Sequence, residues 1–245
     1  SRDFLELIRP SHAIKSLIVF APLFFTFEIN LDLYLITLMA FVLFYLMSST
    51  IYIFNDLIDL DKDKLHRFKM NRPIASGRIT TTEAKYFFII LLFFTTFSSF
   101  VFDQKLFYIL LVYLFLNVLY SIILKKIFLV DVITISVGFI LRLLAGATVT
   151  DIPLSPWIIV ITFLLASLLA VSKRMDSESI TSNNSTNTSK FYTKKNINVI
   201  ILVLTILLLG VYVLFTLFSE IIVNHNILYL PASSIFVTYG VARYL

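Results

Sequence analysis

Long apolar segments recur along the whole chain and alternate with short polar segments. Each apolar segment is long enough to cross a bilayer as an α-helix. We predict spans at residues 13–29, 33–55, 84–102, 105–124, 127–147, 156–172, 196–218 and 227–244. Charged residues make up 14% of the chain, against about 25% in a soluble domain, and the mean hydropathy is +0.93. The pattern predicts an all-α, polytopic transmembrane helical bundle, organised as a single domain over residues 1–245.

The distribution of basic residues predicts the orientation of these spans. If the N-terminus lies inside, all of the 20 Lys and Arg residues except Lys105 and Arg142 fall in or next to inner segments. Basic loops stay in the cytoplasm, so residues 56–83 and 173–195 are predicted to be cytoplasmic loops of a protein of the inner (cell) membrane. We therefore interpret the net charge of +5 as topology and expect no nucleic-acid partner.

Several other functions are disfavoured by what the sequence lacks. It has no cysteine, which excludes disulfides and thiolate metal sites. It has no signal peptide and no Walker loop, GxGxxG, HExxH or GxSxG pattern. The chain starts at Ser1 without Met and stops close to an apolar run, so we expect it to be a fragment.

An acidic cluster stands at the cytoplasmic end of the second predicted span. Asn55, Asp59 and Asp63 recur every four residues, and Asp56 lies three residues before Asp59. If the helix continues, these side chains share one face. Carboxylates so placed repel each other unless a cation neutralises them, and ligands that offer only oxygen suit Mg²⁺. The cluster therefore predicts a magnesium site.

The loop that follows the acids is strongly basic and includes Lys69 and Arg72. Pro73 and Gly77 interrupt any helix here. We therefore expect backbone N–H groups and the Ser76 hydroxyl to be available to an anion.

Further candidates lie at the ends of later spans. Tyr120, Lys125 and Asp131 fall on the same side as the acids, although Tyr120 also suits an aromatic belt. The pair Lys173 and Arg174 could equally reflect only the excess of basic residues at the cytoplasmic ends of membrane spans. Near the N-terminus, Arg9 and Lys15 are either anchors at the lipid headgroups or site residues.

Arg142 lies inside a predicted span, where placing a charged side chain in the bilayer costs at least about 2.5 kcal/mol of free energy. It should face the bundle interior and meet a partner or an anion. A structural ion pair with a buried acid is the alternative.

Acids for Mg²⁺, bases for phosphate and an apolar interior together suit a transfer between a soluble diphosphate and a lipid. Mg²⁺ and the basic groups would stabilise the departing pyrophosphate. A membrane transporter or scaffold that binds an ion is the non-enzymatic alternative.

The motif Asn55-Asp56-x-x-Asp59-x-x-x-Asp63 resembles the first aspartate-rich motif of the UbiA superfamily of membrane prenyltransferases. That superfamily typically has nine helices, so with eight spans present the ninth is expected beyond Leu245. The chain is most similar to the phosphoribosyltransferase branch. The residues that carry this resemblance are Arg9-Pro10, Lys15, 19–22 (VFAP), 72–77 (RPIASG), Tyr120-Ser121, Leu124-Lys125, Gly138-Phe139, Leu141-Arg142, Ala145-Gly146, Lys173-Arg174 and 243–245 (RYL).

The resemblance implies transfer of 5-phosphoribose from phosphoribosyl diphosphate to a polyprenyl phosphate, of the decaprenyl-phosphate type, in the bilayer. It implies that Asn55, Asp56, Asp59 and Asp63 hold Mg²⁺ and that Asp56, Asp59, Asp63 and Lys125 act in catalysis. The substrate contacts expected are Lys15, Lys69, Arg72, Ser76, Tyr120, Asp131, Arg142, Lys173 and Arg174.

Two departures from the branch stand out. Arg67 follows His66 where the branch usually has Pro, and Ser177 replaces an expected acid, between Asp176 and Glu178.

The alternative function is that of a UbiA-type aromatic prenyltransferase that joins a prenyl diphosphate to 4-hydroxybenzoate or a quinone precursor. The absence of a clear second DxxxD motif after the sixth span favours the phosphoribosyl branch.

Overall fold

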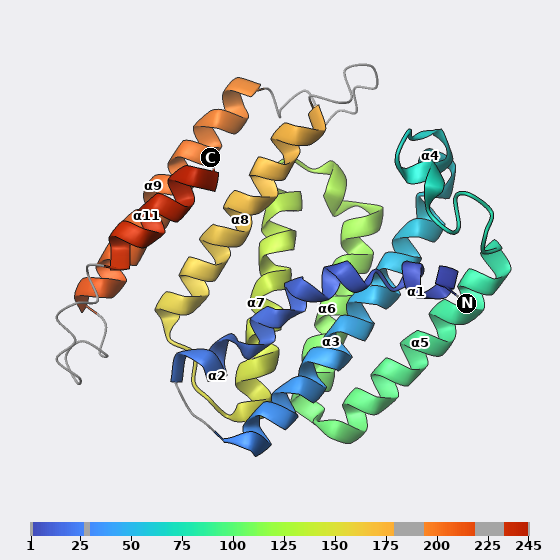
Figure 1. The fold of residues 1–245 in the computed structure, drawn as a ribbon, viewed down its shortest axis with the longest axis horizontal. Coiled ribbons are helices and arrows are strands. Elements are labelled where there is room, and N and C mark those ends of the chain that lie inside the picture. The colour runs from blue at the N-terminus through green and yellow to red at the C-terminus, as the bar shows by residue number, and fades with distance from the viewer. Residues whose placement is uncertain (1, 27–29, 179–193, 219–232, 245) are drawn as a thin grey trace. The chain divides into compact units, whose positions relative to one another are not determined.

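The computed structural model describes residues 2–26, 30–178, 194–218 and 233–244 (Figure 1). Every regular element in these ranges is a helix, which confirms the all-α prediction. The chain divides into two compact units: unit 1 comprises Ser1–Ile123 and Leu141–Pro153, and unit 2 comprises Leu124–Ile140 and Leu154–Leu245. The single-domain organisation stays a prediction.

Unit 1 begins with three short helical elements. They are α1 (Arg2–Leu7), the 3₁₀ helix η1 (Pro10–Phe20) and α2 (Ala21–Thr26). The expected single span over 13–29 is helical as far as Thr26, because η1 continues directly into α2. It is not one of the helices of the described residues that are long enough to cross a membrane, so this span stays a prediction. Pro22 has no N–H to donate to a preceding turn, and the change from the 3₁₀ to the α form falls beside it.

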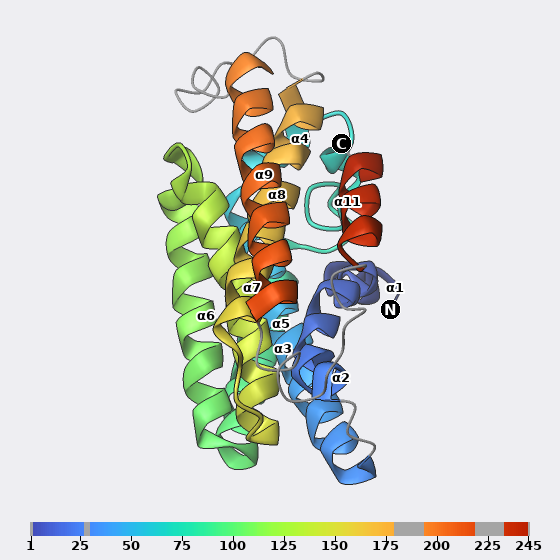
Figure 2. The ribbon, with the colours of Figure 1, turned by 90° about the vertical axis from the view of Figure 1, so that its left-hand side faces the viewer.

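The helix α3 (Leu31–Ile58) is the central element of unit 1. Both α5 (Thr81–Phe102) and α6 (Gln104–Ile122) pack against it and against each other (Figures 1 and 2). Side-chain caps begin both helices: Thr80 and Glu83 form a reciprocal capping box at α5, and Asp103 accepts from the Leu106 N–H at α6. These caps define where the spans start.

The loop between α3 and α5 is packed rather than open. It contains α4 (Leu60–Leu65) and η2 (Lys69–Asn71). Ile74 and Ile79 are buried in a cluster with Leu7 of α1, Ile53 of α3 and Leu91 of α5. Burial of such side chains contributes roughly 1.5–3 kcal/mol each, so the loop has a defined conformation.

Unit 2 contains η3 (Leu124–Lys126), α8 (Pro156–Glu178), α9 (Lys194–Phe218) and α11 (Ser233–Tyr244). The helix α7 (Val130–Thr150) supplies residues to both units. Side by side, α8 and α9 bury Leu168, Val171 and Ile197 (Figure 2). The Tyr212 and Ser233 hydroxyls lie 2.9 Å apart and connect α9 to α11.

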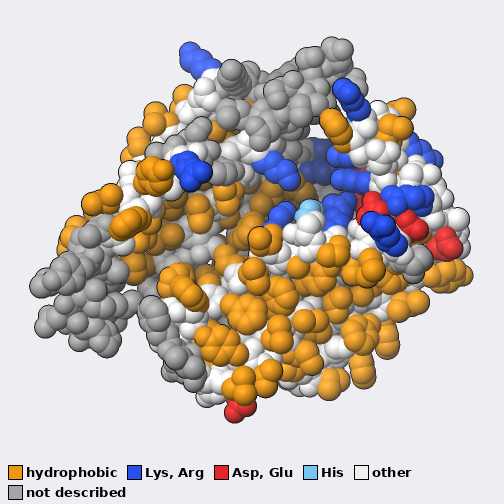
Figure 3. Space-filling model, viewed as in Figure 1, with side chains coloured by type: hydrophobic (Ala, Val, Ile, Leu, Met, Phe, Trp, Pro, Cys, Tyr) orange, Lys and Arg blue, Asp and Glu red, His pale blue; other side chains and the backbone are white. Residues whose placement is uncertain are grey.

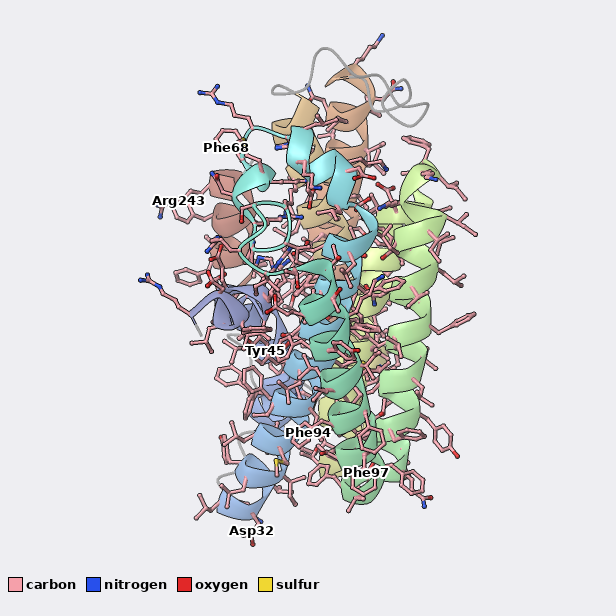
Figure 4. The ribbon with its side chains drawn as sticks, turned by 90° about the vertical axis from the view of Figure 1, so that its right-hand side faces the viewer. Asp32, Tyr45, Phe68, Phe94, Phe97 and Arg243 are labelled. Atoms are coloured by element: carbon pink, nitrogen blue, oxygen red, sulfur yellow. The ribbon has the colours of Figure 1, made fainter. Side chains whose placement is uncertain are left out.

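Six helices of the described residues are long and apolar enough to cross a membrane. They agree with the predictions at 33–55, 84–102, 105–124, 127–147, 156–172 and 196–218. Large apolar side chains such as Phe94 and Phe97 stay exposed on α5 (Figure 4), as lipid contact requires. The predicted span at 227–244 lies partly outside the described residues, and α11 covers its end. The chain is a multi-pass membrane protein.

Candidate functional site

The predicted acidic motif lies where α3 ends and α4 begins. The Asp59 N–H donates to the Asn55 carbonyl at 2.9 Å, and the Asp63 N–H donates to the Asp59 carbonyl at 2.8 Å. The helical path therefore continues across the junction, and Asp56 and Asp63 lie about two turns apart on one face. Both are buried, with 3% and 2% of their surface exposed. Acidic and basic side chains gather over α4 and the loop beside it (Figure 3).

One guanidinium nitrogen bridges the two buried carboxylates. Arg72 Nη1 donates to Asp56 Oδ1 at 3.0 Å and to Asp63 Oδ2 at 2.6 Å. Lys69 Nζ lies 3.9 Å from Asp63 Oδ1. Without these cations two buried acids so close together would repel each other, so the basic loop stabilises the acidic motif.

Arg9 reaches the same carboxylate from the N-terminal segment. Its Nη2 donates to Asp56 Oδ1 at 2.5 Å, and its guanidinium lies 4.9 Å from the centre of the Tyr52 ring. The Arg9 backbone is left-handed, at φ 49° and ψ 68°, which is uncommon for a residue other than glycine. Hydrogen bonds from Tyr45 and Ser49 to the Ile8 carbonyl hold this conformation in place. Strain maintained in this way is typical of functional positions.

The Arg72–Gly77 turn uses its polar groups internally. The Ser76 N–H and hydroxyl both donate to the Arg72 carbonyl, at 2.9 and 2.8 Å, and the Gly77 N–H donates to the Ile74 carbonyl. Gly77 has φ 78°, which glycine adopts without cost. The expectation that these N–H groups and the Ser76 hydroxyl are available to an anion is therefore wrong. The turn needs them to fix the backbone that carries Arg72.

Arg78 ties this turn to α1. Its guanidinium donates to Asp3, to both oxygens of Glu6 and to the Asn71 carbonyl. The hydrogen bonds to Glu6 raise the pKa of Arg78, so its charge persists. The contact links α1 to the loop that carries Arg72.

The predicted intramembrane arginine faces the interior of unit 1. Arg142 is 5% exposed and donates to the Tyr113 hydroxyl at 2.6 Å and to Ser48 Oγ at 3.3 Å. Its guanidinium also lies over the rings of Phe44 and Tyr113. Hydroxyl oxygens that accept from the guanidinium, and aromatic faces beside it, lower the free-energy cost of burying the cation. The expected interior location is confirmed.

Two predicted site residues of unit 1 lie beside the pair of carboxylates rather than on the arginine bridge. Asn55 accepts a short hydrogen bond through Oδ1 from the buried Ser121 hydroxyl. Asp59 is half-buried, and its carboxylate lies 3.7 Å from Lys62 Nζ. Tyr120 precedes Ser121 on α6, and Lys15 is half-buried in η1. Their roles stay predictions.

The remaining predicted residues belong to unit 2. Lys125 lies in η3, Asp131 is buried in the first turn of α7, and Lys173 is exposed near the end of α8. Arg174 follows in α8, and its side chain lies outside the described residues. The convergence of these residues with the Asp56 cluster stays a prediction.

Three residues of this region have no site role assigned from the sequence: Arg9 fits a headgroup anchor as well as a site residue, and neither Ser48 nor Tyr113 belongs to a predicted motif. A usable signal existed for two of them. Ser48 lies seven residues before Asn55, on the same helix face, and Tyr113 is in mid-span, far from the interface where tyrosine is common. The backbone strain at Arg9 has no signature in the sequence.

The sequence as a whole matches a known family. The UbiA prenyltransferase family matches residues 16–245. The chain belongs to this family. Family membership indicates a transferase, in agreement with the fold class and the predicted motif.

Three relatives of this UbiA member have different names. The uncharacterized protein y4nM of Sinorhizobium fredii is 32% identical over 175 residues, which cover 71% of this chain and 34% of that protein. The decaprenyl-phosphate phosphoribosyltransferase of Mycolicibacterium smegmatis is 30% identical over 175 residues, covering 69% and 55%. A 4-hydroxybenzoate octaprenyltransferase of Haemophilus ducreyi is 29% identical over 114 residues, covering 46% and 41%. The chain thus spans about half or less of the length of these relatives.

Solved structures show the same fold. A UbiA homolog from Archaeoglobus fulgidus bound to GPP and Mg²⁺ aligns with 99% of this chain and 85% of its own, with a TM-score of 0.74 and 21% identity. The helical arrangement of the UbiA family is therefore present here.

The donor set of the acidic motif fits a divalent cation. Among the described residues, no group of three or more His, Asp or Glu side chains could hold a metal ion. Asp56 and Asp63 do share one cationic partner, Arg72. Mg²⁺ usually takes one or two carboxylates, and waters and substrate phosphates complete its shell. A pair of carboxylates is sufficient for that mode of binding.

Proposed function

We propose that this UbiA family member transfers 5-phosphoribose from phosphoribosyl diphosphate to a polyprenyl phosphate and releases pyrophosphate. The observation that carries the proposal is the pair of buried carboxylates, Asp56 and Asp63, enclosed by Arg9, Arg72 and Lys69. Such a cluster suits a diphosphate that arrives with a divalent cation. The name of the mycobacterial relative supports phosphoribose as the transferred group.

Each group near the carboxylates has a defined task in this reaction. Asp56 and Asp63, with Asn55 and Asp59 beside them, would hold Mg²⁺, which neutralises charge on the departing pyrophosphate. Arg9, Arg72 and Lys69 bind the diphosphate oxygens. Because Arg9 and Arg72 are partly withdrawn from water, each contact to phosphate is stronger than it would be on an open surface.

The bond changes balance without an added co-reactant. An ionised oxygen of the lipid phosphate attacks C1 of the ribose, and the bond from C1 to the pyrophosphate oxygen breaks. Pyrophosphate leaves with the electron pair. Lys125, Lys173, Arg174 and Arg142 are the cations proposed to hold the acceptor phosphate and the 5-phosphate of the ribose, with Lys15, Tyr120 and Asp131 as further substrate contacts.

The apolar spans give the lipid its place. Six helices with bilayer-length apolar runs can hold a long polyprenyl chain and exclude water from the electron-deficient C1. We place the site on the cytoplasmic side of the inner membrane, where a soluble phosphorylated sugar is available.

The test is to identify the product. The full chain, purified in detergent with Mg²⁺, is given phosphoribosyl diphosphate plus a polyprenyl phosphate, or a prenyl diphosphate plus 4-hydroxybenzoate. A lipid that carries pentose phosphate supports the proposal. A prenylated hydroxybenzoate would instead assign the aromatic prenyltransferase reaction, which the relative from Haemophilus ducreyi performs by its name. A Mg²⁺-loaded protein with neither product would favour a transporter or scaffold.

A further inference from the structure

We propose that Arg72 and a divalent cation compete for one position between Asp56 and Asp63, and that Arg72 turns to the diphosphate when the cation binds. The inference rests on the proposed function in one respect, namely that the ligand is a metal-bound diphosphate. It does not depend on which group is transferred, so the two can fail separately.

The first step of the argument is the position of one atom. Arg72 Nη1 lies within hydrogen-bond distance of Asp56 Oδ1 and Asp63 Oδ2 at once. A metal ion that bound both carboxylates through these oxygens would need the space that this nitrogen fills. Occupation by the guanidinium and by the metal is therefore mutually exclusive.

The second step is charge balance. Two buried carboxylates face two arginines, Arg9 and Arg72, and Lys69 lies at the edge, 3.9 Å from Asp63 Oδ1. A divalent cation added to this set would leave a large excess of positive charge in a partly buried place. A diphosphate that arrives with the metal removes the excess, because the displaced guanidinium gains a phosphate partner.

The third step identifies which arginine moves. Arg9 is held by its left-handed backbone, by the anchored Ile8 carbonyl and by the Tyr52 ring. Arg72 has a fixed backbone, but 29% of its side chain is exposed, and its guanidinium lies over no aromatic ring of the described residues. Arg9 thus stays on Asp56, while Arg72 is free to rotate about its side-chain torsions.

Competition of this kind couples the two ligands. The metal alone must break the ion pairs of Arg72 with Asp56 and Asp63, so it binds weakly. When a diphosphate arrives with the metal, Arg72 gains a new anionic partner, so the two ligands bind well together. The coupling is reciprocal, so the metal strengthens diphosphate binding by the same factor. The enzyme would thereby avoid holding a metal that carries no substrate.

The experiment measures Mn²⁺ binding to the full chain in detergent by the loss of the free-ion EPR signal, with no lipid or sugar present. Arg72→Gln removes the competitor and is expected to tighten Mn²⁺ binding about tenfold, equivalent to about 1.4 kcal/mol. Lys69→Gln is the matched control, because it also removes one positive charge beside Asp63 but does not open the bridged position. Its effect should stay below about fivefold, as for an exposed pair.

Inorganic pyrophosphate provides the second arm. After correction for Mn²⁺ bound to pyrophosphate in solution, pyrophosphate should tighten Mn²⁺ binding strongly in the wild type and little in Arg72→Gln. The proposal is overturned if Arg72→Gln binds Mn²⁺ no tighter than the wild type, or if Lys69→Gln tightens it equally. Absence of Mn²⁺ binding with and without pyrophosphate would overturn it as well.

If Arg72→Gln folds poorly, its melting temperature with and without Mn²⁺ tests the proposal instead. The variant is purified in Mn²⁺ and then treated with EDTA, and its melting temperature is followed. Mn²⁺ is expected to stabilise Arg72→Gln more than the wild type, because the ion replaces the missing guanidinium between the acids. Equal or smaller stabilisation by Mn²⁺ would contradict the competition.

Discussion

At the scale of single residues, a buried charge is tolerated only through the groups that contact it. Arg142 shows this in the apolar interior, where it donates to Tyr113 and Ser48. The two hydroxyls also lie 3.2 Å from each other, so the three side chains form one network. Loss of one member leaves the others with an unsatisfied polar group in a medium without water.

Tyr113→Phe tests this network. The change removes the hydroxyl at 2.6 Å from Arg142 and keeps the ring, so it should destabilise the protein by about 1–3 kcal/mol. Melting temperature in detergent is the readout, with Tyr108→Phe, an exposed tyrosine on the same helix, as the control. Equal melting temperatures for the two variants would show that Arg142 does not need the Tyr113 hydroxyl.

Residue identity predicted the acidic motif and the buried arginine, but it did not predict their partners. The spacing of Asn55, Asp56, Asp59 and Asp63 indicated a shared helix face, and Asp56 and Asp63 do come together. That they meet around Arg72 depends on how the turn at Gly77 folds back, which is a tertiary property. For the same reason, Ser76 was predicted as an anion contact although its hydroxyl closes the turn.

At the scale of elements, the apolar runs predicted the long helices well, because length and hydropathy alone define a span. The first predicted span, at 13–29, is less regular, because its described part changes from the 3₁₀ helix η1 to α2 beside Pro22. Within unit 1, glycine at position 146 allows η1 to approach α7 closely, because a Cβ on Gly146 would collide with the Val19 carbonyl oxygen.

Gly146→Ala tests how closely η1 approaches α7 at this point. Alanine favours a helix over glycine by about 1 kcal/mol, but here the added carbon meets a backbone atom that cannot rotate away. We expect a loss of about 1–3 kcal/mol or more and a lower melting temperature. Gly210→Ala in α9 is the control, because nothing lies within 4 Å of its Cβ position, and it should leave stability unchanged or raise it. A neutral Gly146→Ala would mean that η1 does not lie against this helix.

At the scale of the whole molecule, the distribution of Lys and Arg predicts the orientation of the chain in the membrane, which the helices alone do not define. The loop that contains α4 and the turn between α5 and α6 lie at opposite ends of α5. In Figure 4, Phe68 marks one end of this part of the chain, and Asp32 and Phe97 mark the other. The excess of Lys and Arg predicts that the Phe68 end faces the cytoplasm. The proposed use of a soluble phosphorylated sugar requires the same orientation.

Because the chain has no cysteine, single cysteines can test this orientation directly. Phe68→Cys and Gln104→Cys place exposed thiols at the two ends of α5. In inside-out membrane vesicles a membrane-impermeant maleimide should label Phe68→Cys, and in spheroplasts it should label Gln104→Cys. Each variant is labelled again after the membrane is opened with detergent, which shows that both thiols react. Labelling of Phe68→Cys in intact spheroplasts would reverse the topology and, with it, place the acidic motif out of reach of a cytoplasmic diphosphate.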